Sequence, residues 1–213
     1  QPSISIENFV KPEVSTQKKI RYDLSLPKKY IFYPAMYLPH KNHKTIIDTI
    51  VLLKEKYNKL YKVVFCGNDI GYLDNLKIYA SSKKVDNQIL FLNFINDELL
   101  PYLYLDASLV LMSPIIGPTM IPPWEAFKMK VPVLYSSIKG IKDVLEDCVI
   151  YIDPLDKENM AKEIIEIYEN EKLKKELIDK GYKKYLHVKE NKEFNKIFKA
   201  IDNYFNIKTL WEK

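Results

Sequence analysis

Short apolar segments rich in β-branched and aromatic residues alternate with segments of helical period from residue 28 onward, and this alternation limits the folds open to the chain. Strands that alternate with helices form parallel sheets with helices on both faces. The sequence therefore predicts an α/β fold built on a Rossmann-like, doubly wound parallel sheet of about six strands. These strands are expected at Tyr30–Tyr33, Tyr61–Cys66, Gln88–Leu92, Ser108–Met112, Pro132–Tyr135 and Val149–Ile152.

The chain of 213 residues has room for one large domain of this kind. Residues 1–27 are polar and without a clear period, and we interpret them as a lead-in arm or interdomain linker. Residues 28–213 are predicted to form the domain, with a helical tail from about residue 156. That tail is expected in three pieces, at Lys157–Asn170, Glu171–Leu186 and Lys192–Phe205, although Gly181 counts against a continuous second piece.

The charge pattern argues against a nucleic-acid binder. The formal net charge is +5, but Arg21 is the only arginine, and arginine makes most of the bidentate contacts that read bases. The apolar runs are shorter than the roughly 20 residues that a membrane-spanning helix needs. The lysines of the helical tail form either a solvated helix face or a peripheral contact with anionic lipid.

The cysteine and histidine content does not suggest a metal site or a disulfide. Cys66 and Cys148 lack metal-ligand spacing, and two buried free thiols are the simpler interpretation. His40 and His43 have no third ligand nearby in the sequence. We therefore expect no metal and no cofactor.

Ligands of doubly wound sheets bind beyond the carboxyl ends of the strands, so the loops there are the places to look for a site. Lys41 follows one strand and directly precedes a helix, where its charge would neutralise a phosphate. The Gly67-Asn68-Asp69 turn follows the next strand. It either lets a ligand approach the backbone or simply ends the strand.

The loop at residues 113–123 carries the strongest signals. Gly117 lies where the backbone turns sharply or approaches something closely, and Thr119 or Met120 would cap the helix that follows. A free helix N-terminus binds anions. Glu125, expected in the first helical turn, would either accept hydrogen bonds from a diol such as ribose or stabilise the helix dipole by roughly 0.3–1 kcal/mol.

The ordered set of motifs resembles a known family. The set comprises Lys41, Cys66-Gly67, Phe91-Leu92-Asn93, Trp124-Glu125-Ala126 and Val131-Pro132-Val133. Together they resemble the C-terminal, donor-nucleotide-binding domain of retaining "group one" (family 4) glycosyltransferases, which have the GT-B fold. The resemblance covers about residues 28–170, and the stretches 39–43 and 117–125 are similar to one bacterial subgroup.

The resemblance implies transfer of a sugar from a nucleoside-diphosphate sugar, of UDP or GDP type, to an acceptor hydroxyl with retention. Lys41 and Glu125 would be the catalytic residues: Lys41 stabilises the leaving diphosphate and Glu125 binds the ribose hydroxyls. The remaining donor-binding residues that the resemblance implies are His40, Gly67, Asn68, Asn93, Phe94, Gly117, Pro118, Thr119, Met120 and Ile121.

Three positions depart from the family pattern. The first glutamate of the family's Glu-x7-Glu motif falls on Gly117, and the usual arginine five residues before the lysine falls on Met36. The glycine of the Gly-x-Pro-Val turn falls on Lys130. The first two changes remove polar groups from the expected sugar site, so they also fit a non-catalytic nucleotide-sugar-binding or interaction module. A sugar-nucleotide epimerase is a third alternative, but the group of several acidic residues and a histidine that abstracts the proton in such enzymes is not apparent in these loops.

An enzyme of this kind holds its site between two domains, and this chain has room for one. We expect the acceptor, a sugar or lipid-linked glycan, to bind an N-terminal domain outside this chain. The chain alone would then bind donor weakly and transfer little or no sugar. The family implies polysaccharide or glycolipid synthesis in the cytoplasm, with a possible peripheral location at the inner membrane face.

Overall fold

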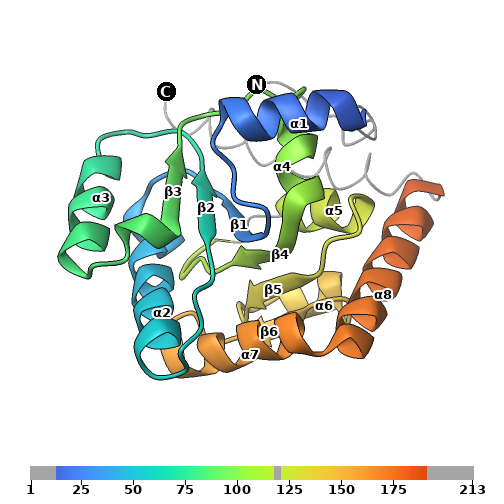
Figure 1. Cartoon of the computed structure of the whole chain (residues 1–213). Coiled ribbons are helices and arrows are strands. Elements are labelled where there is room, and N and C mark those ends of the chain that lie inside the picture. Colours follow the sequence, from blue (N-terminus) through green and yellow to red (C-terminus); the bar gives the residue numbers. More distant parts are fainter. Residues whose placement is uncertain (1–12, 118–120, 191–213) are drawn as a thin grey trace, which may run out of the picture.

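The predicted strands form one parallel sheet in the computed structural model, which describes residues 13–117 and 121–190. Within these residues the sheet has six strands in the order β3-β2-β1-β4-β5-β6 (Figure 1). The strands are β1 (Tyr30–Pro34), β2 (Val63–Cys66), β3 (Ile89–Leu92), β4 (Ala107–Met112), β5 (Val133–Ser136) and β6 (Ile150–Ile152). This strand order is that of the doubly wound dinucleotide-binding fold, so the predicted fold class is confirmed.

Helices connect the strands, as the alternating pattern predicts. They are α1 (Val14–Asp23), α2 (His43–Glu55), α3 (Leu73–Ser82), α4 (Leu100–Asp106), α5 (Ile121–Lys128), α6 (Ile141–Leu145), α7 (Lys157–Glu169) and α8 (Glu171–Glu190), with short 3-10 turns at Pro39–Lys41 and Asp86–Gln88. The third piece of the predicted tail lies outside the described residues.

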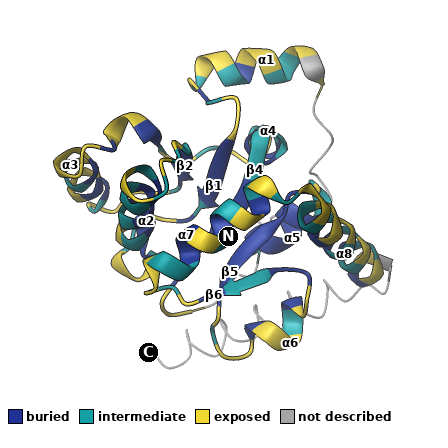
Figure 2. Cartoon of the chain, turned by 60° about the horizontal axis from the view of Figure 1, so that its bottom comes forward, coloured by how far each residue is buried: buried dark blue, intermediate teal, exposed yellow. Residues whose placement is uncertain are grey.

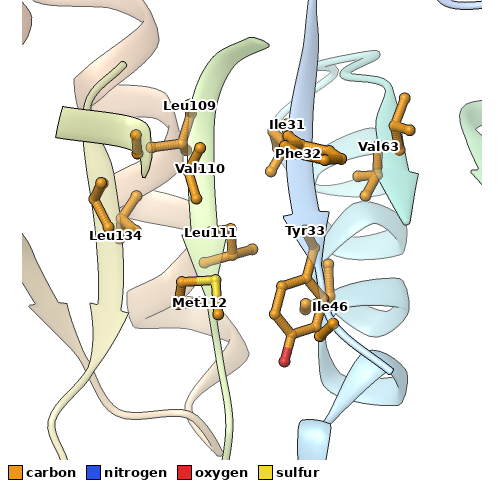
Figure 3. Close-up of a cluster of buried hydrophobic side chains, with 14 of the residues drawn as sticks. Ile31, Phe32, Tyr33, Ile46, Val63, Leu109, Val110, Leu111, Met112 and Leu134 are labelled. Carbon is orange, nitrogen blue, oxygen red and sulfur yellow. The ribbon is translucent and has the colours of Figure 1, made fainter. Parts of the chain in front are cut away.

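The centre of the sheet is buried on both faces. Every residue of β2 and β5 is buried, as are the last four residues of β4. Figure 3 shows Ile31 and Phe32 of β1 between Val63 of β2 and Val110 of β4. Strands covered on both faces appear in the sequence as continuous apolar runs, which is why their predicted bounds lie close to the observed ones.

The two C-terminal helices close the domain on both sides. Helix α7 packs against α2, and α8 packs against α5 (Figure 2). Gly181 lies inside α8, which runs without interruption over Glu171–Glu190, so the predicted helix at Glu171–Leu186 is confirmed. A Cβ atom at Gly181 would lie 2.5 Å from Cδ1 of Phe127, and the missing side chain therefore lets α8 approach α5 closely.

Helix α1 lies in the segment that we interpreted as a lead-in arm or interdomain linker, for which no helix was predicted. The guanidinium of Arg21 donates to both carboxylate oxygens of Asp106 on α4, at 2.9 and 2.5 Å, and Gln17 donates to the same group at 2.5 Å. The Asp106 side chain is 6% exposed. A largely buried, bidentate pair fixes geometry better than an exposed one, so α1 is tied to α4.

Lys130 explains the glycine that the family has at this position. It follows α5 with a φ of 58°, in the left-handed region that favours glycine, and its ammonium lies 4.4 Å from the ring centroid of Tyr182. A side chain in this backbone conformation costs roughly 1–2 kcal/mol, while the cation–π contact returns about 0.5–1 kcal/mol. The lysine therefore replaces the glycine at a small net cost.

We expect Lys130→Gly to be more stable than Lys130→Ala by about 1 kcal/mol. Both variants lose the contact with Tyr182, but only glycine relieves the left-handed backbone. Urea unfolding of the two variants measures the difference. Alanine equal to or better than glycine, which is the order in a helix interior, would show that the backbone is not strained there.

Candidate functional site

A cleft of about 330 Å³ opens at the carboxyl ends of the strands, beside the switch point between β1 and β4. Ligands of open α/β sheets bind at such points. Its lining comes from the ends of β1 and β2, the segment before α4 and the start of α5, and consists of Pro34, Ala35, Met36, Lys41, Cys66, Gly67, Asn68, Phe94, Ile95, Asp97, Leu100, Ile121, Pro122 and Glu125.

Lys41 brings a cation to this cleft. It ends the 3-10 turn after β1, and the Tyr33 hydroxyl donates to its main-chain oxygen at 2.5 Å. The amide of Ile115 donates to the carbonyl of His40 at 2.9 Å, which joins the lysine loop to the loop after β4. The side chain is half-buried, and this burial lowers the pKa of its ammonium. A positive charge in a partly desolvated wall attracts anions more strongly than one in open solvent.

Asn42 fixes the lysine loop and was missed by the sequence analysis. It is buried with a φ of 63°, and its amide nitrogen donates to Oγ of Ser113 at 3.1 Å and to the carbonyl of Pro154 at 2.6 Å. Its amide oxygen accepts from Oγ1 of Thr45 at 2.6 Å. Asparagine tolerates the left-handed region, so one residue both turns the chain and connects three elements.

Glu125 brings a buried carboxyl to the same cleft. It was expected in the first turn of its helix, but α5 begins at Ile121 and Glu125 is its fifth residue. The residue is 2% exposed, and the hydroxyl of Tyr104 donates to its Oε2 at 2.6 Å. The simple helix-dipole interpretation therefore does not apply. Burial raises the pKa of this carboxyl to about 7, although the bond from Tyr104 acts in the opposite direction.

Gly67 lies on the cleft wall, where its backbone closely approaches the segment after β1. A Cβ atom there would lie 2.2 Å from the carbonyl oxygen of Ala35 and 2.8 Å from the amide nitrogen of Met36. The glycine is required by the neighbouring chain segment, whether or not a ligand approaches it. Asn68, the next residue, is exposed on the same wall.

The other predicted donor-binding residues divide into three groups. Phe94, 61% exposed, and Ile121 line the cleft. His40, Asn93 and Gly117 are exposed in the surrounding loops but do not line it. Gly117 has a φ of 75°, which confirms a sharp turn. The remaining three, residues 118–120, lie outside the described residues.

Two other groups near the cleft have strongly shifted pKa values. His43 is 1% exposed, its ring lies among Tyr33, Tyr37 and Phe65, and burial lowers its pKa to about 3. Cys66 is a buried free thiol whose pKa burial raises to about 12. Both groups are therefore neutral at ordinary pH, and the predicted free thiols are confirmed, since Cys148 is also free and buried.

Comparison with known proteins identifies the family. Residues 15–184 match the family described as "Glycosyl transferases group 1". The chain belongs to this family. The O-antigen chain mannosyltransferase B of Escherichia coli is 25% identical to the chain over 137 residues, which cover 64% of this chain and 36% of that protein. Family membership favours a glycosyltransferase over the epimerase alternative.

Solved structures of glycosyltransferases share the fold. The C-terminal domain of the Francisella tularensis group 1 protein LpcC matches with a TM-score of 0.70 at 18% identity, over 85% of this chain and 96% of that one. Anabaena HepE, in complex with UDP and glucose, matches with a TM-score of 0.75 at 17% identity, over 91% of this chain and 54% of that one. These likenesses confirm the GT-B-type Rossmann-like domain.

The chain spans 33 to 39% of the length of the curated relatives it matches. Across residues 13–117 and 121–190, no helix has the length and apolar character needed to cross a membrane.

Proposed function

We propose that this chain is the donor-binding half of a retaining glycosyltransferase and binds the nucleoside-diphosphate part of a sugar donor in the cleft. One observation carries the proposal: Lys41 and Glu125 come from separate elements and line the same cleft at the strand switch point. A cation and a carboxylate in one cleft suit the two parts of a nucleoside diphosphate, because the phosphates are anionic and the ribose is a diol.

Lys41 and the N-terminal end of α5 would hold the diphosphate. The negative charge of the diphosphate increases as its bond to the sugar breaks. A fixed cation and a helix N-terminus therefore stabilise the transition state more than they stabilise the bound donor. Ile121, the first residue of α5, lines the cleft, so the N-terminal end of α5 lies at its edge. The helix dipole is then directed at the same group as the lysine.

Glu125 would accept hydrogen bonds from the ribose hydroxyls. Its carboxyl is buried, where such bonds are strong, and it is ionised above a pH of about 7. Asn68 and Phe94 would contact the nucleoside at the outer part of the cleft. These two residues would select the base of a donor of UDP or GDP type.

Transfer itself would need the domain that binds the acceptor, so we expect little or no turnover by this chain alone. Detectable sugar transfer by the purified chain would contradict that expectation. The non-catalytic alternative, a nucleotide-sugar-binding or interaction module, is favoured by Gly117 and Met36, which replace two polar residues of the family pattern. A nucleotide-sugar-binding module would also bind a diphosphate, whereas an interaction module need not. Activity of the chain joined to an acceptor domain separates the catalytic from the non-catalytic interpretation.

Calorimetric titration with UDP, GDP and ADP at pH 8 tests the proposal, because Glu125 is ionised at that pH. We expect saturable binding of one diphosphate. Lys41→Ala and Glu125→Ala should each weaken it at least tenfold, which corresponds to about 1.4 kcal/mol. A loss of this size is close to the net contribution of one hydrogen bond to a charged group.

Lys54→Ala is the matched control, since Lys54 lies in the last turn of α2 and Lys41 precedes the same helix. It should leave the affinity unchanged, because it does not line the cleft. A folded wild-type chain that binds none of the three diphosphates would overturn the proposal. So would binding that both cleft substitutions leave unchanged.

A further inference from the structure

Tyr104 contacts Glu125 but is not part of the cleft lining. It belongs to α4, its side chain is fully buried, and its hydroxyl lies 2.6 Å from Oε2 of Glu125. It does not line the cleft and so would not touch a bound nucleotide. We propose that Tyr104 is a positioning residue, which holds Oε2 of Glu125 and presents the ionised carboxylate, through Oε1, to the ribose hydroxyls. This inference rests on the proposed function.

The position of the Tyr104 hydroxyl is fixed by contacts that involve no ligand. Its ring packs edge-to-face on Phe32 of β1, with centroids 5.0 Å apart and an interplanar angle of 89°. The preceding residue, Leu103, accepts a hydrogen bond of 2.7 Å from the hydroxyl of Tyr30. Asp106, one half-turn later, is held by Arg21 of α1. The donor to Glu125 is thus preorganised by the sheet and by α1.

Such a donor affects the charge as well as the orientation of the carboxyl. Burial and the nearby carboxylate of Asp97 raise the pKa of Glu125, and the bond from Tyr104 lowers it. Burial also raises the pKa of the Tyr104 hydroxyl, which therefore remains a donor. The cleft further contains Lys41 and the neutral thiol of Cys66. Without the Tyr104 hydroxyl, the carboxyl would keep its proton at neutral pH and lose acceptor strength for a diol.

Tyr104→Phe separates this role from simple packing, because it retains the ring on Phe32 and removes only the hydroxyl. Tyr102→Phe, on the same helix, is the matched control; Tyr102 is half-buried and does not line the cleft. Glu125→Gln removes the titrating group. Its binding curve shows the pH dependence that comes from the diphosphate, whose own second pKa is about 6.

The affinity for the diphosphate that binds the wild type is measured from pH 6 to 9. We expect wild-type affinity to fall below a pH of about 7, beyond the fall seen in Glu125→Gln. Tyr104→Phe should bind at least fivefold more weakly at pH 7, recover towards pH 9, and have its midpoint shifted upward by about one pH unit. Tyr102→Phe should follow the wild type. A midpoint in Tyr104→Phe equal to that of the wild type would overturn the proposal.

A ligand-free measurement keeps this inference separate from the proposed function. The carboxyl carbon of Glu125, assigned in ¹³C NMR spectra by comparison with Glu125→Gln, reports its pKa directly. We expect a higher value in Tyr104→Phe than in the wild type and in Tyr102→Phe. An unchanged value would overturn the role of Tyr104 whatever the binding result. If the wild type binds no diphosphate but Tyr104→Phe still raises the pKa of Glu125, the proposed function is overturned. The control of this carboxyl by Tyr104 is then established on its own.

Discussion

Gly67→Ala is expected to destabilise the protein by on the order of 3 kcal/mol or more. The Cβ atom that the substitution adds would lie 2.2 Å from the carbonyl oxygen of Ala35 and 2.5 Å from its carbonyl carbon. These are backbone atoms directly after β1, so no side-chain rotation can relieve the clash. The segments after β1 and β2 would have to separate, and they are the two segments that form the adjoining walls of the cleft.

Urea unfolding of Gly67→Ala and Gly71→Ala measures this effect with a control from the same loop. Gly71 has a φ of 101°, and a Cβ atom there would meet nothing within 4 Å. Its substitution therefore adds backbone strain without a clash, at a cost of roughly 1–2 kcal/mol. If Gly67→Ala lost no more stability than Gly71→Ala, the close approach of the two segments would not be what requires the glycine.

The same glycine illustrates what a sequence reveals about such a fold and what it does not. The strand that ends at Cys66 is predictable because its residues are buried on both faces and read as an apolar run. The glycine after it marks a special backbone position. What it accommodates depends on Ala35, on a neighbouring strand end about 30 residues earlier, and no local pattern identifies that contact.

Helix α1 was missed for a related reason. Its apolar residues have no clear period, so the usual signal of an amphipathic helix is absent. The helix is anchored by polar contacts from Gln17 and Arg21 to Asp106, which lies more than 80 residues away in the chain. Polar contacts over such a separation leave no local signature.

The sequence predicted which loops and which two charged residues would line the candidate site. Parallel strands bring their carboxyl ends to one edge, so a lysine and a glutamate in loops at that edge were expected to face one ligand. The environment of each depended on the tertiary structure. The helix begins at Ile121, which places Glu125 beyond the first turn and into the interior, where Tyr104 meets it. The asparagine after Lys41 showed no function in the sequence because its partners, Ser113 and Pro154, come from distant loops.

Two buried groups beside the cleft should give the protein an unusual dependence of stability on pH. His43 has its pKa lowered from 6.5 to about 3 by burial, so the unfolded chain takes up its proton more readily. The free energy of unfolding therefore decreases as the pH falls below 6.5, by about 5 kcal/mol in total by pH 3. Glu125 has the opposite effect. Its pKa is raised from 4.5 to about 7, so stability decreases by about 3 kcal/mol as the pH rises between these values.

The two effects oppose each other between pH 4.5 and 6.5, where each has a slope of about 1.4 kcal/mol per pH unit. We expect His43→Phe, which suits the surrounding rings of Tyr33, Tyr37 and Phe65, to lose the acid sensitivity. Glu125→Gln should lose the decrease towards pH 7. Urea unfolding at half-unit steps from pH 4 to 8 gives the free energy of unfolding of each variant and of the wild type. Subtracting the wild-type value from each variant's value cancels the titration of the other groups. The two difference curves should slope in opposite directions across the shared window. Difference curves that stay flat there would show that neither group is held in its neutral form by the fold.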